Sequence, residues 1–484
     1  MRPLVPPPLA LLALSGCLID RSAIGVGEAV GGLDAFLDPS VDASLVAPRP
    51  PDASLDAWLD PRFDAWAPDA FVPPPDAWVS DAWAADAWAP DAFRCTPRCD
   101  GATLVACDGT RTPCVACGTS VAVGEPHCLA LVPSNTPPGY AVSTDRSAIE
   151  AVFPADSFQW DTSRCRREDL RIGSRQFHDS QVRTATVGGV EVCIVGARRF
   201  ELDPGTRLYV EGSLPLVLVA SESFVLPSGA IVDVSSFNEP GDCSRTAQVG
   251  PGARSSGSGA GGDGRAATAE FGDGGGGGGG FCGLGGAGGM GNLVSGAAGG
   301  GRVGGPSVAL AGGFPGGRGS PDSRGGAGGA GGGALQISAP RITFGGVIDA
   351  RGQSGRGGAE TASGGGGGSG GAVLLEALVL EASAGLIDVR GGGGGGGADL
   401  DSGAMCGGIE PAPGPQTGGA GASRGGDGAG GSAVDGAAGG SGYNGGGGGG
   451  GAGCVVIRQA GAAEGPDTAP SAVGVVATSP PEVR

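Results

Sequence analysis

The 484-residue chain contains no lysine, and all 30 of its basic residues are arginine. A glycine-rich phosphate loop ending in Lys-Ser or Lys-Thr is therefore excluded. The formal net charge is −19 and no basic cluster is present. This argues against nucleic acid as a partner, because such binding depends on neutralising phosphates. Only two histidines, His127 and His178, are present. We therefore predict no metal, no cofactor and no histidine-based catalytic relay.

The chain also lacks an apolar run long enough to cross a membrane. The longest candidate, residues 4–14, has about 11 residues, whereas a spanning helix needs about 20. With Met1 and Arg2 in front of it, this segment is typical of a signal peptide. It ends in Leu14-Ser15-Gly16-Cys17, which resembles the lipobox of bacterial lipoproteins. The resemblance implies that residues 1–16 are removed and that Cys17 is diacylated.

Two acyl chains give stable membrane anchoring, so the membrane is an expected partner through Cys17. The residue after the cysteine is Leu18 rather than aspartate. We therefore expect a surface-exposed location on the outer membrane. The alternative is an ordinary secretory signal with a cysteine nearby.

Residues 34–93 repeat Asp-Ala followed by Trp, Phe or Ser, with prolines interspersed. The late copies recur every five residues, which matches neither the helical nor the strand period. Repulsion between aspartates and stiffening by proline predict a disordered, extended tether over residues 17–94. An aromatic ligand strip for a partner or glycan is the alternative.

Thirteen cysteines are present, and twelve remain once Cys17 is set aside. Six of them fall within residues 95–133, where some spacings also suit zinc. In an oxidising compartment we favour a disulfide-rich module. Sequence proximity suggests the further pairs Cys165–Cys193, Cys243–Cys282 and Cys406–Cys454. The disulfide candidates are Cys95, Cys99, Cys107, Cys114, Cys117, Cys128, Cys165, Cys193, Cys243, Cys282, Cys406 and Cys454.

Short β-branched runs broken by glycine recur along the second half of the chain. Three copies align, at residues 215–235, 334–352 and 372–391, and a partial fourth copy begins at Cys454. Period-two alternation places Ile348 and Ile387 on one face, with Asp349 and Asp388 on the other. One such unit cannot bury its apolar face alone, so stacked rungs are expected. The predicted fold class is all-β, a parallel β-helix or solenoid.

Glycine tracts separate the rungs, at residues 274–280, 364–368, 391–397 and 445–451; 84 of the 105 glycines lie between Gly250 and Cys454. The tracts are either disordered loops, because glycine loses the most backbone freedom on ordering, or packed polyglycine-II helices. Regular calcium-binding glycine repeats do not occur.

From Cys17 to the last rung, the chain resembles the glycine-rich β-solenoid lipoproteins of myxobacteria. The lipobox, the cysteine cluster and the Ile-Asp-Val/Ala-Arg-Gly rung endings carry the resemblance, which implies a surface location more than any activity. The expected order is a signal peptide (1–16), a tether (17–94), a disulfide module (95–133), a cap or connecting segment (134–199), a solenoid (200–460) and a disordered tail (461–484).

Three rung aspartates, Asp233, Asp349 and Asp388, are the candidates for a catalytic or calcium-binding site. Glycoside hydrolysis needs two carboxylates at a defined separation. The simpler interpretation is a solvated ladder in which Arg351 and Arg390 pair with the neighbouring aspartates. We therefore expect no catalytic residues, and a structural or adhesive role with a glycan or cell-surface partner. The alternative is a glycan-active β-helix enzyme, a polysaccharide lyase or hydrolase.

Overall fold

The computed structural model describes residues 96–120, 123–142, 150–172, 175–176, 181–236, 249–267, 272–304, 310–321, 324–382, 385–399, 404–407, 423–430, 433–460, 471–473 and 475–479. The predicted signal peptide, the lipobox with Cys17, the tether, Cys95 and Cys243 lie outside these residues. The chain divides into two units, Met1–Ala85 and Asp86–Arg484, and every described residue belongs to the second.

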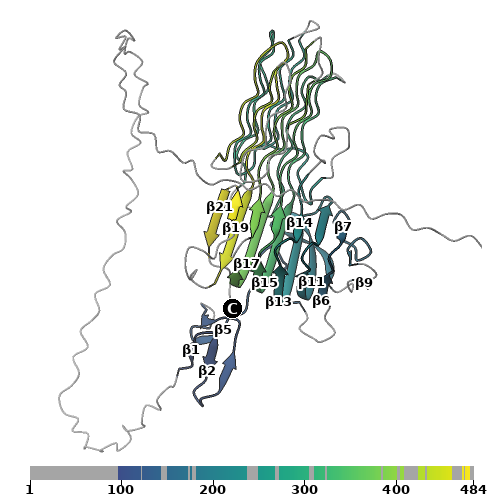
Figure 1. Cartoon of the computed structure of the whole chain (residues 1–484). Coiled ribbons are helices and arrows are strands. Elements are labelled where there is room, and N and C mark those ends of the chain that lie inside the picture. Colours follow the sequence, from purple (N-terminus) through teal and green to yellow (C-terminus); the bar gives the residue numbers. More distant parts are fainter. Residues whose placement is uncertain are drawn as a thin grey trace, which may run out of the picture. The chain divides into compact units, whose positions relative to one another are not determined.

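The described elements are all β-strands, and no helix long and apolar enough to cross a membrane occurs among them. Most of them form a solenoid, in which each rung contributes a long strand to one parallel sheet and a short strand to another (Figure 1). The rungs are β6 (Glu150–Phe153) with β7 (Ser157–Asp161), β11 (Val190–Leu202) with β12 (Arg207–Glu211), β13 (Leu216–Leu226) with β14 (Ile231–Asp233), β15 (Ala334–Phe344) with β16 (Val347–Asp349), β17 (Ala372–Glu381) with β18 (Leu386–Asp388), β19 (Cys454–Gln459) with β20 (Ser471–Val473), and finally β21 (Val475–Ser479).

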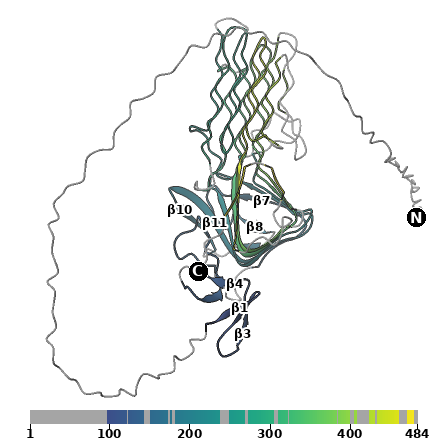
Figure 2. The same ribbon diagram turned by 90° about the vertical axis from the view of Figure 1, so that its left-hand side faces the viewer.

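The long strands bend, which gives the solenoid a third side (Figure 2). The register between β11 and β13 shifts after Ala197, and that between β13 and β15 shifts after Val219. Such irregularities let one strand turn a corner while its ladder continues on both sides. A hairpin strand, β10 (Val182–Val187), pairs antiparallel with β11 at the edge of the sheet.

Smaller sheets complete the fold. A short hairpin pairs β8 (Arg171–Ile172) with β9 (Arg175–Gln176). The cysteine module contains β1 (Arg98–Asp100), β2 (Thr103–Val105), β3 (Arg111–Pro113), β4 (Cys117–Thr119) and β5 (Pro126–Cys128). It is held by the disulfides Cys99–Cys117 and Cys114–Cys128, so disulfides rather than zinc account for these four cysteines.

The solenoid extends beyond both predicted ends. It begins with β6 and β7 inside the segment expected to be a cap, and residues 471–473 and 475–479 continue the two sheets instead of forming a disordered tail. The last two strands pair with β18 and β19. These residues form strands because β18 and β19 offer backbone groups for pairing at the end of each sheet. The local composition does not reveal such a neighbour.

The predicted inward faces are confirmed by the core. Val232, Ile348 and Ile387 stack in register on successive rungs, and each is fully buried. On the long strands, Phe200, Phe224 and Ile342 form a similar column. Because inward positions repeat at the same register, each rung extends one continuous apolar core.

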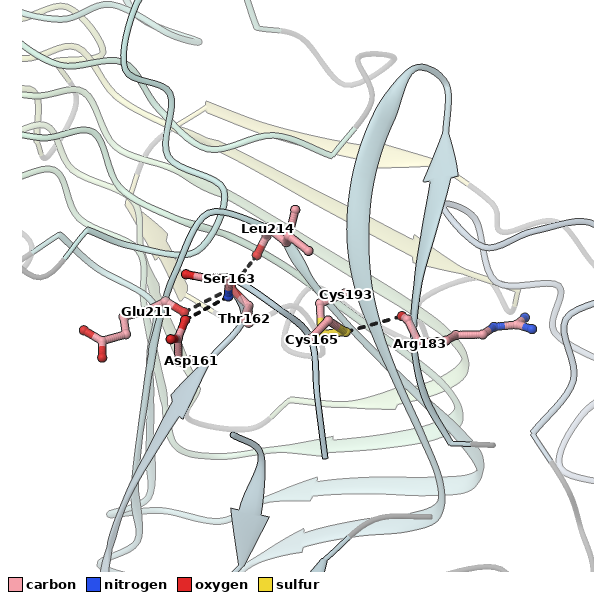
Figure 3. The surroundings of a disulfide bond; sticks show 8 residues. All are labelled: Asp161, Thr162, Ser163, Cys165, Arg183, Cys193, Glu211 and Leu214. Atoms are coloured by element: carbon pink, nitrogen blue, oxygen red, sulfur yellow. Dashed lines mark hydrogen bonds between the residues drawn. A yellow bond between two sulfur atoms is a disulfide. The ribbon is translucent and has the colours of Figure 1, made fainter. Parts of the chain in front are cut away.

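A disulfide closes the start of the solenoid. Cys165, in the loop after β7, bonds to Cys193 on β11, as sequence proximity suggested (Figure 3). Beside it, the hydroxyl of Thr162 donates to the carbonyl oxygens of Glu211 and Leu214, at 3.0 and 2.7 Å. The backbone of the first rung is thereby tied to the second.

Candidate functional site

The glycine tracts form an ordered bundle at the edge where the solenoid strands β15, β17 and β19 begin (Figures 1 and 2). The segment 274–280 shows how it is built. All seven of its amide groups donate, and the accepting segment changes in a cycle of three residues. Gly274, Gly277 and Gly280 donate to segment 259–265. Gly275 and Gly278 donate to segment 286–289, and Gly276 and Gly279 donate to segment 364–367. A three-residue repeat without internal hydrogen bonds is typical of polyglycine-II helices.

The bundle has hexagonal packing. The carbonyls of segment 274–280 accept from three further segments, which gives six hydrogen-bonded neighbours: 259–265, 286–289, 297–300, 314–317, 364–367 and 448–451. Segments 364–371 and 445–453 are likewise surrounded. A Cβ added at Gly277 would lie 1.9 Å from the carbonyl oxygen of Ala298. Only glycine fits such an interior position, for the reason that applies to the axis of collagen.

The sequence distinguishes interior segments from surface segments. The uninterrupted tracts 274–280, 364–368, 391–397 and 445–451 are buried throughout. Surface segments instead read Gly-Gly-X, and the X residue is the most exposed of each three in segment 283–291, where Leu284, Ala287 and Met290 point outward. Since three residues make one turn, outward residues recur about every 9 Å along a segment.

One side of the bundle is a flat face of three adjacent segments. Segment 286–289 contacts both interior segments 274–280 and 445–451, and it is flanked by 297–300 and 437–440. In a hexagonal lattice these three segments lie in one row. Their outward residues, at three-residue spacing, are Ser295, Ala298, Gly301, Leu284, Ala287, Met290, Asp435, Ala438 and Ser441. Asp435 is charged, and it pairs at 3.1 Å with Arg302, the residue that follows Gly301.

Large apolar side chains gather at the end of the bundle remote from the strands. Met290, Leu293 and Tyr443 are 57%, 61% and 57% exposed. They are held together because Gly442 donates its amide to the Met290 carbonyl and Asn292 donates to the Tyr443 carbonyl. We call these three residues the apolar tip.

The opposite end of the bundle is anchored by side chains. Phe281 and Phe314 pack there with their ring centroids 6.2 Å apart, and both are almost fully buried. Cys282 bonds to Cys454, at the start of β19. The predicted pairs Cys243–Cys282 and Cys406–Cys454 are therefore wrong. The hexagonal packing brings segments 274–280 and 445–451 together, although Cys282 and Cys454 are 172 residues apart.

All ten cysteines within the described residues are in disulfides; besides the pairs already named, these are Cys107 and Cys406. Disulfides of this number indicate an oxidising, extracytoplasmic environment. No group of three or more histidine, cysteine or acidic residues suited to a metal ion occurs in the described part of the chain.

The three rung aspartates form a ladder, but it is not solvated as expected. Asp233, Asp349 and Asp388 lie in register on β14, β16 and β18, and the latter two are 7% and 4% exposed. Arg390 is 1% exposed. The reason is that the glycine segments leave the solenoid directly after Arg351 and Arg390; Gly352 already donates its amide to the Arg390 carbonyl. The ladder therefore lies at the root of the bundle.

Each of the two later carboxylates is engaged by its own arginine. The Nε of Arg390 donates to both oxygens of Asp388, at 2.9 and 3.0 Å, and Arg351 binds Asp349 in the same way. A serine, Ser235, occupies the corresponding position beside Asp233 and donates to it at 2.6 Å. Burial, and then the nearby charge of Asp349, raise the pKa of Asp233 to about 6. Two of the three catalytic candidates are thus held in ion pairs, which is typical of a structural ladder.

A second buried polar cluster was not expected from the sequence. Glu376 on β17 is 1% exposed and accepts from the backbone amide and hydroxyl of Ser134, at 3.0 and 2.6 Å. Gln336, Ser338 and Arg458 also donate to it. Segment 134–140 is thereby fixed across the outer face of β15, β17 and β19. A usable signal exists, since Gln336, Ser338 and Glu376 interrupt apolar runs of two aligned copies.

Tyr140 continues this docking. Its ring lies beneath the Arg183 guanidinium, 4.2 Å from the centroid, and burial raises its pKa to about 12. A Cβ at Gly196 would lie 2.6 Å from the Tyr140 hydroxyl oxygen, so the absent side chain on β11 makes room for it.

Comparisons with family models, with curated proteins and with solved structures found no match to this chain.

Proposed function

We propose that this protein is a lipid-anchored cell-surface protein with a structural and adhesive role, and that the glycine bundle is its contact surface. The flat face carries this proposal. A lattice with a backbone interior presents outward side chains at fixed spacing, and those of the flat face are almost all small or apolar. Exposed apolar patches bordered by polar residues are typical of interaction sites.

The apolar tip supports adhesion in particular. Tyr443, Met290 and Leu293 are exposed on a scaffold whose other side chains are mostly small. Aromatic residues and methionine are enriched at recognition surfaces. Their attachment to a rigid lattice lowers the entropy lost when a partner binds.

The surface location is supported by the disulfides and by the lipobox. Metabolic labelling with a clickable fatty acid tests the anchor. The wild type is expected to be labelled, and Cys17→Ser is expected to remain unlabelled. Equal labelling of both chains would refute lipidation at Cys17.

Binding of the full chain to intact cells and to a glycan array tests adhesion. The variant Leu284→Ser/Met290→Ser/Tyr443→Ser should reduce binding by about tenfold or more, because a few central apolar residues dominate most interfaces. The matched control is Ala327→Ser/Ala330→Ser, which changes two half-buried positions of the Gly-Gly-Ala segment 325–333.

If the triple variant binds as strongly as the wild type, the contact surface lies elsewhere on the molecule. Absence of binding to cells and glycans by the wild type would refute the adhesive role. Release of reducing or unsaturated sugar ends from polysaccharides would instead favour the glycan-active enzyme.

A further inference from the structure

An open pocket of about 430 Å³ lies where the first rungs meet the bundle. Three segments distant in sequence form most of it: the start of β11 with Glu191, the β12–β13 turn with Ser213, and the start of the bundle with Arg254, Ser255 and Ser256. This volume is within the range of small-ligand sites, in which a few polar groups converge on a partly apolar wall.

The pocket wall is rigid. Gly252 adopts φ +68, and a Cβ there would lie 2.5 Å from the Pro215 side chain. The amide of Gly252 donates to the Gly212 carbonyl, and its own carbonyl accepts from Gly312. The β12–β13 turn and the start of the bundle are thus joined by backbone contacts at a position that only glycine permits, which fixes the backbone of this part of the pocket wall before a ligand arrives.

Arg254 supplies a guanidinium group to the lining of the pocket. Its guanidinium lies over the buried Phe314 ring, 4.9 Å from the centroid, and its backbone amide donates to the Gly313 carbonyl. Stacking fixes the guanidinium plane but uses none of its N–H donors. Within the described residues, neither Arg254 nor Glu191 has a hydrogen-bond or ion-pair partner from its side chain.

We propose that this pocket binds a carboxylate-bearing sugar unit, with Arg254 paired to the carboxylate and with Glu191 and the serine hydroxyls bonded to ring hydroxyls. An immobilised, half-buried guanidinium favours a planar anion that it can bind bidentately. A simple anion would contact Arg254 alone, whereas a sugar unit also offers hydroxyl donors to the exposed Glu191 carboxylate at the pocket wall. Ser213, Ser255 and Ser256 add hydroxyls that donate and accept. Since the pocket is open, a longer glycan can continue beyond it.

The residues that line this pocket are separate from the flat face and the apolar tip. Uronate binding here and adhesion through the flat face are therefore tested by different substitutions. Calorimetric titration of the full chain with a panel of uronate oligosaccharides tests it. The matched probes are the same oligosaccharides as methyl esters, in which a methyl group replaces the negative charge of each carboxylate. We expect the esters to bind about tenfold to a hundredfold more weakly, as for loss of a charged hydrogen-bond partner.

Arg254→Gln should weaken uronate binding by the same factor, and Arg254→Lys should give an intermediate loss because it keeps the charge without the planar fork. The control is Arg424→Gln, which removes an exposed bundle arginine paired with Asp427 at 2.8 Å. Unchanged thermal midpoints establish that the variants fold.

Three results would overturn the proposal. They are equal binding of acid and ester, full affinity in Arg254→Gln, and no binding of any uronate by the wild type. Free glutamate is included as a zwitterionic probe. Its binding in place of the uronates would show an amino-acid site, and would also refute the sugar assignment.

Discussion

The solenoid and the glycine bundle are stabilised in opposite ways. In the solenoid, side chains such as Ile348 and Ile387 fill a continuous apolar core, and the backbone hydrogen bonds join neighbouring rungs. In the bundle interior there are no side chains, and backbone groups both fill the space and make the bonds. Burial of apolar area therefore stabilises the first region, whereas the second depends on satisfied polar groups and close packing.

The difference shows that order does not require a hydrophobic core. Glycine costs about 1 kcal/mol more than alanine to order in regular structure. The bundle offsets this cost because every amide of segment 274–280 is bonded. It also grows from an existing fold, since each of the three glycine-rich stretches begins after a short strand (β14, β16 or β18) and ends at the next long strand (β15, β17 or β19).

The largest expected effect is in the solenoid core. Ile387→Asp places a carboxylate without a partner among fully buried apolar side chains, which costs several kcal/mol or more. We expect loss of the cooperative thermal transition, measured by circular dichroism. Ile387→Val is the control and should cost about 0.5–1.5 kcal/mol. A normal transition in Ile387→Asp would mean that the side chain is not inward.

The next effect concerns the ladder at the root of the bundle. Asp388→Ala leaves the buried Arg390 guanidinium without its bidentate partner, and breaking such a pair costs about 3–5 kcal/mol. Denaturant unfolding measures the loss. The double variant Asp388→Ala/Arg390→Met, which removes both charges, should recover much of it. A loss below about 1 kcal/mol in the single variant would indicate that the pair is exposed to solvent, as the sequence suggested.

A smaller but regional effect is expected in the bundle. Gly277→Ala forces a Cβ against the Ala298 carbonyl and should destabilise by about 1–3 kcal/mol. Hydrogen exchange should accelerate in segment 274–280 itself and in segments 297–300 and 448–451, whose amides donate to its carbonyls, with the solenoid strands unaffected. Gly262→Ala is the control, since its nearest atom would lie 3.3 Å away. Equal exchange in both variants would contradict the hexagonal packing.

The smallest effect is a pH dependence. The raised pKa of Asp233, about 6 in the fold, means that the folded chain binds more protons than the unfolded chain between about pH 4 and pH 6. Stability should therefore fall as pH rises through this window, by about 1–3 kcal/mol. Asp233→Asn should remove that part of the dependence in denaturant unfolding series. An unchanged pH profile would show that Asp233 is ionised without cost.

The sequence predicted the solenoid more completely than the bundle. Period-two alternation is a local signal, and it placed Ile348 and Ile387 correctly because the inward face of a rung depends on its own residues. Whether a glycine tract is ordered depends instead on neighbours from distant segments, such as 364–367 beside 274–280. The Cys282–Cys454 pair and the burial of Arg390 follow from that packing. The flat face and the pocket at Arg254 require it as well.

The three-residue cycle of the bundle also limits how the gene can change in length. One residue added to segment 274–280 would rotate everything after it by a third of a turn. Each amide would then point toward the wrong neighbour, and in a surface segment such as 283–291 an outward side chain would turn inward. Only changes in multiples of three keep the phase, so tract length is expected to vary among descendants of this gene in steps of three codons.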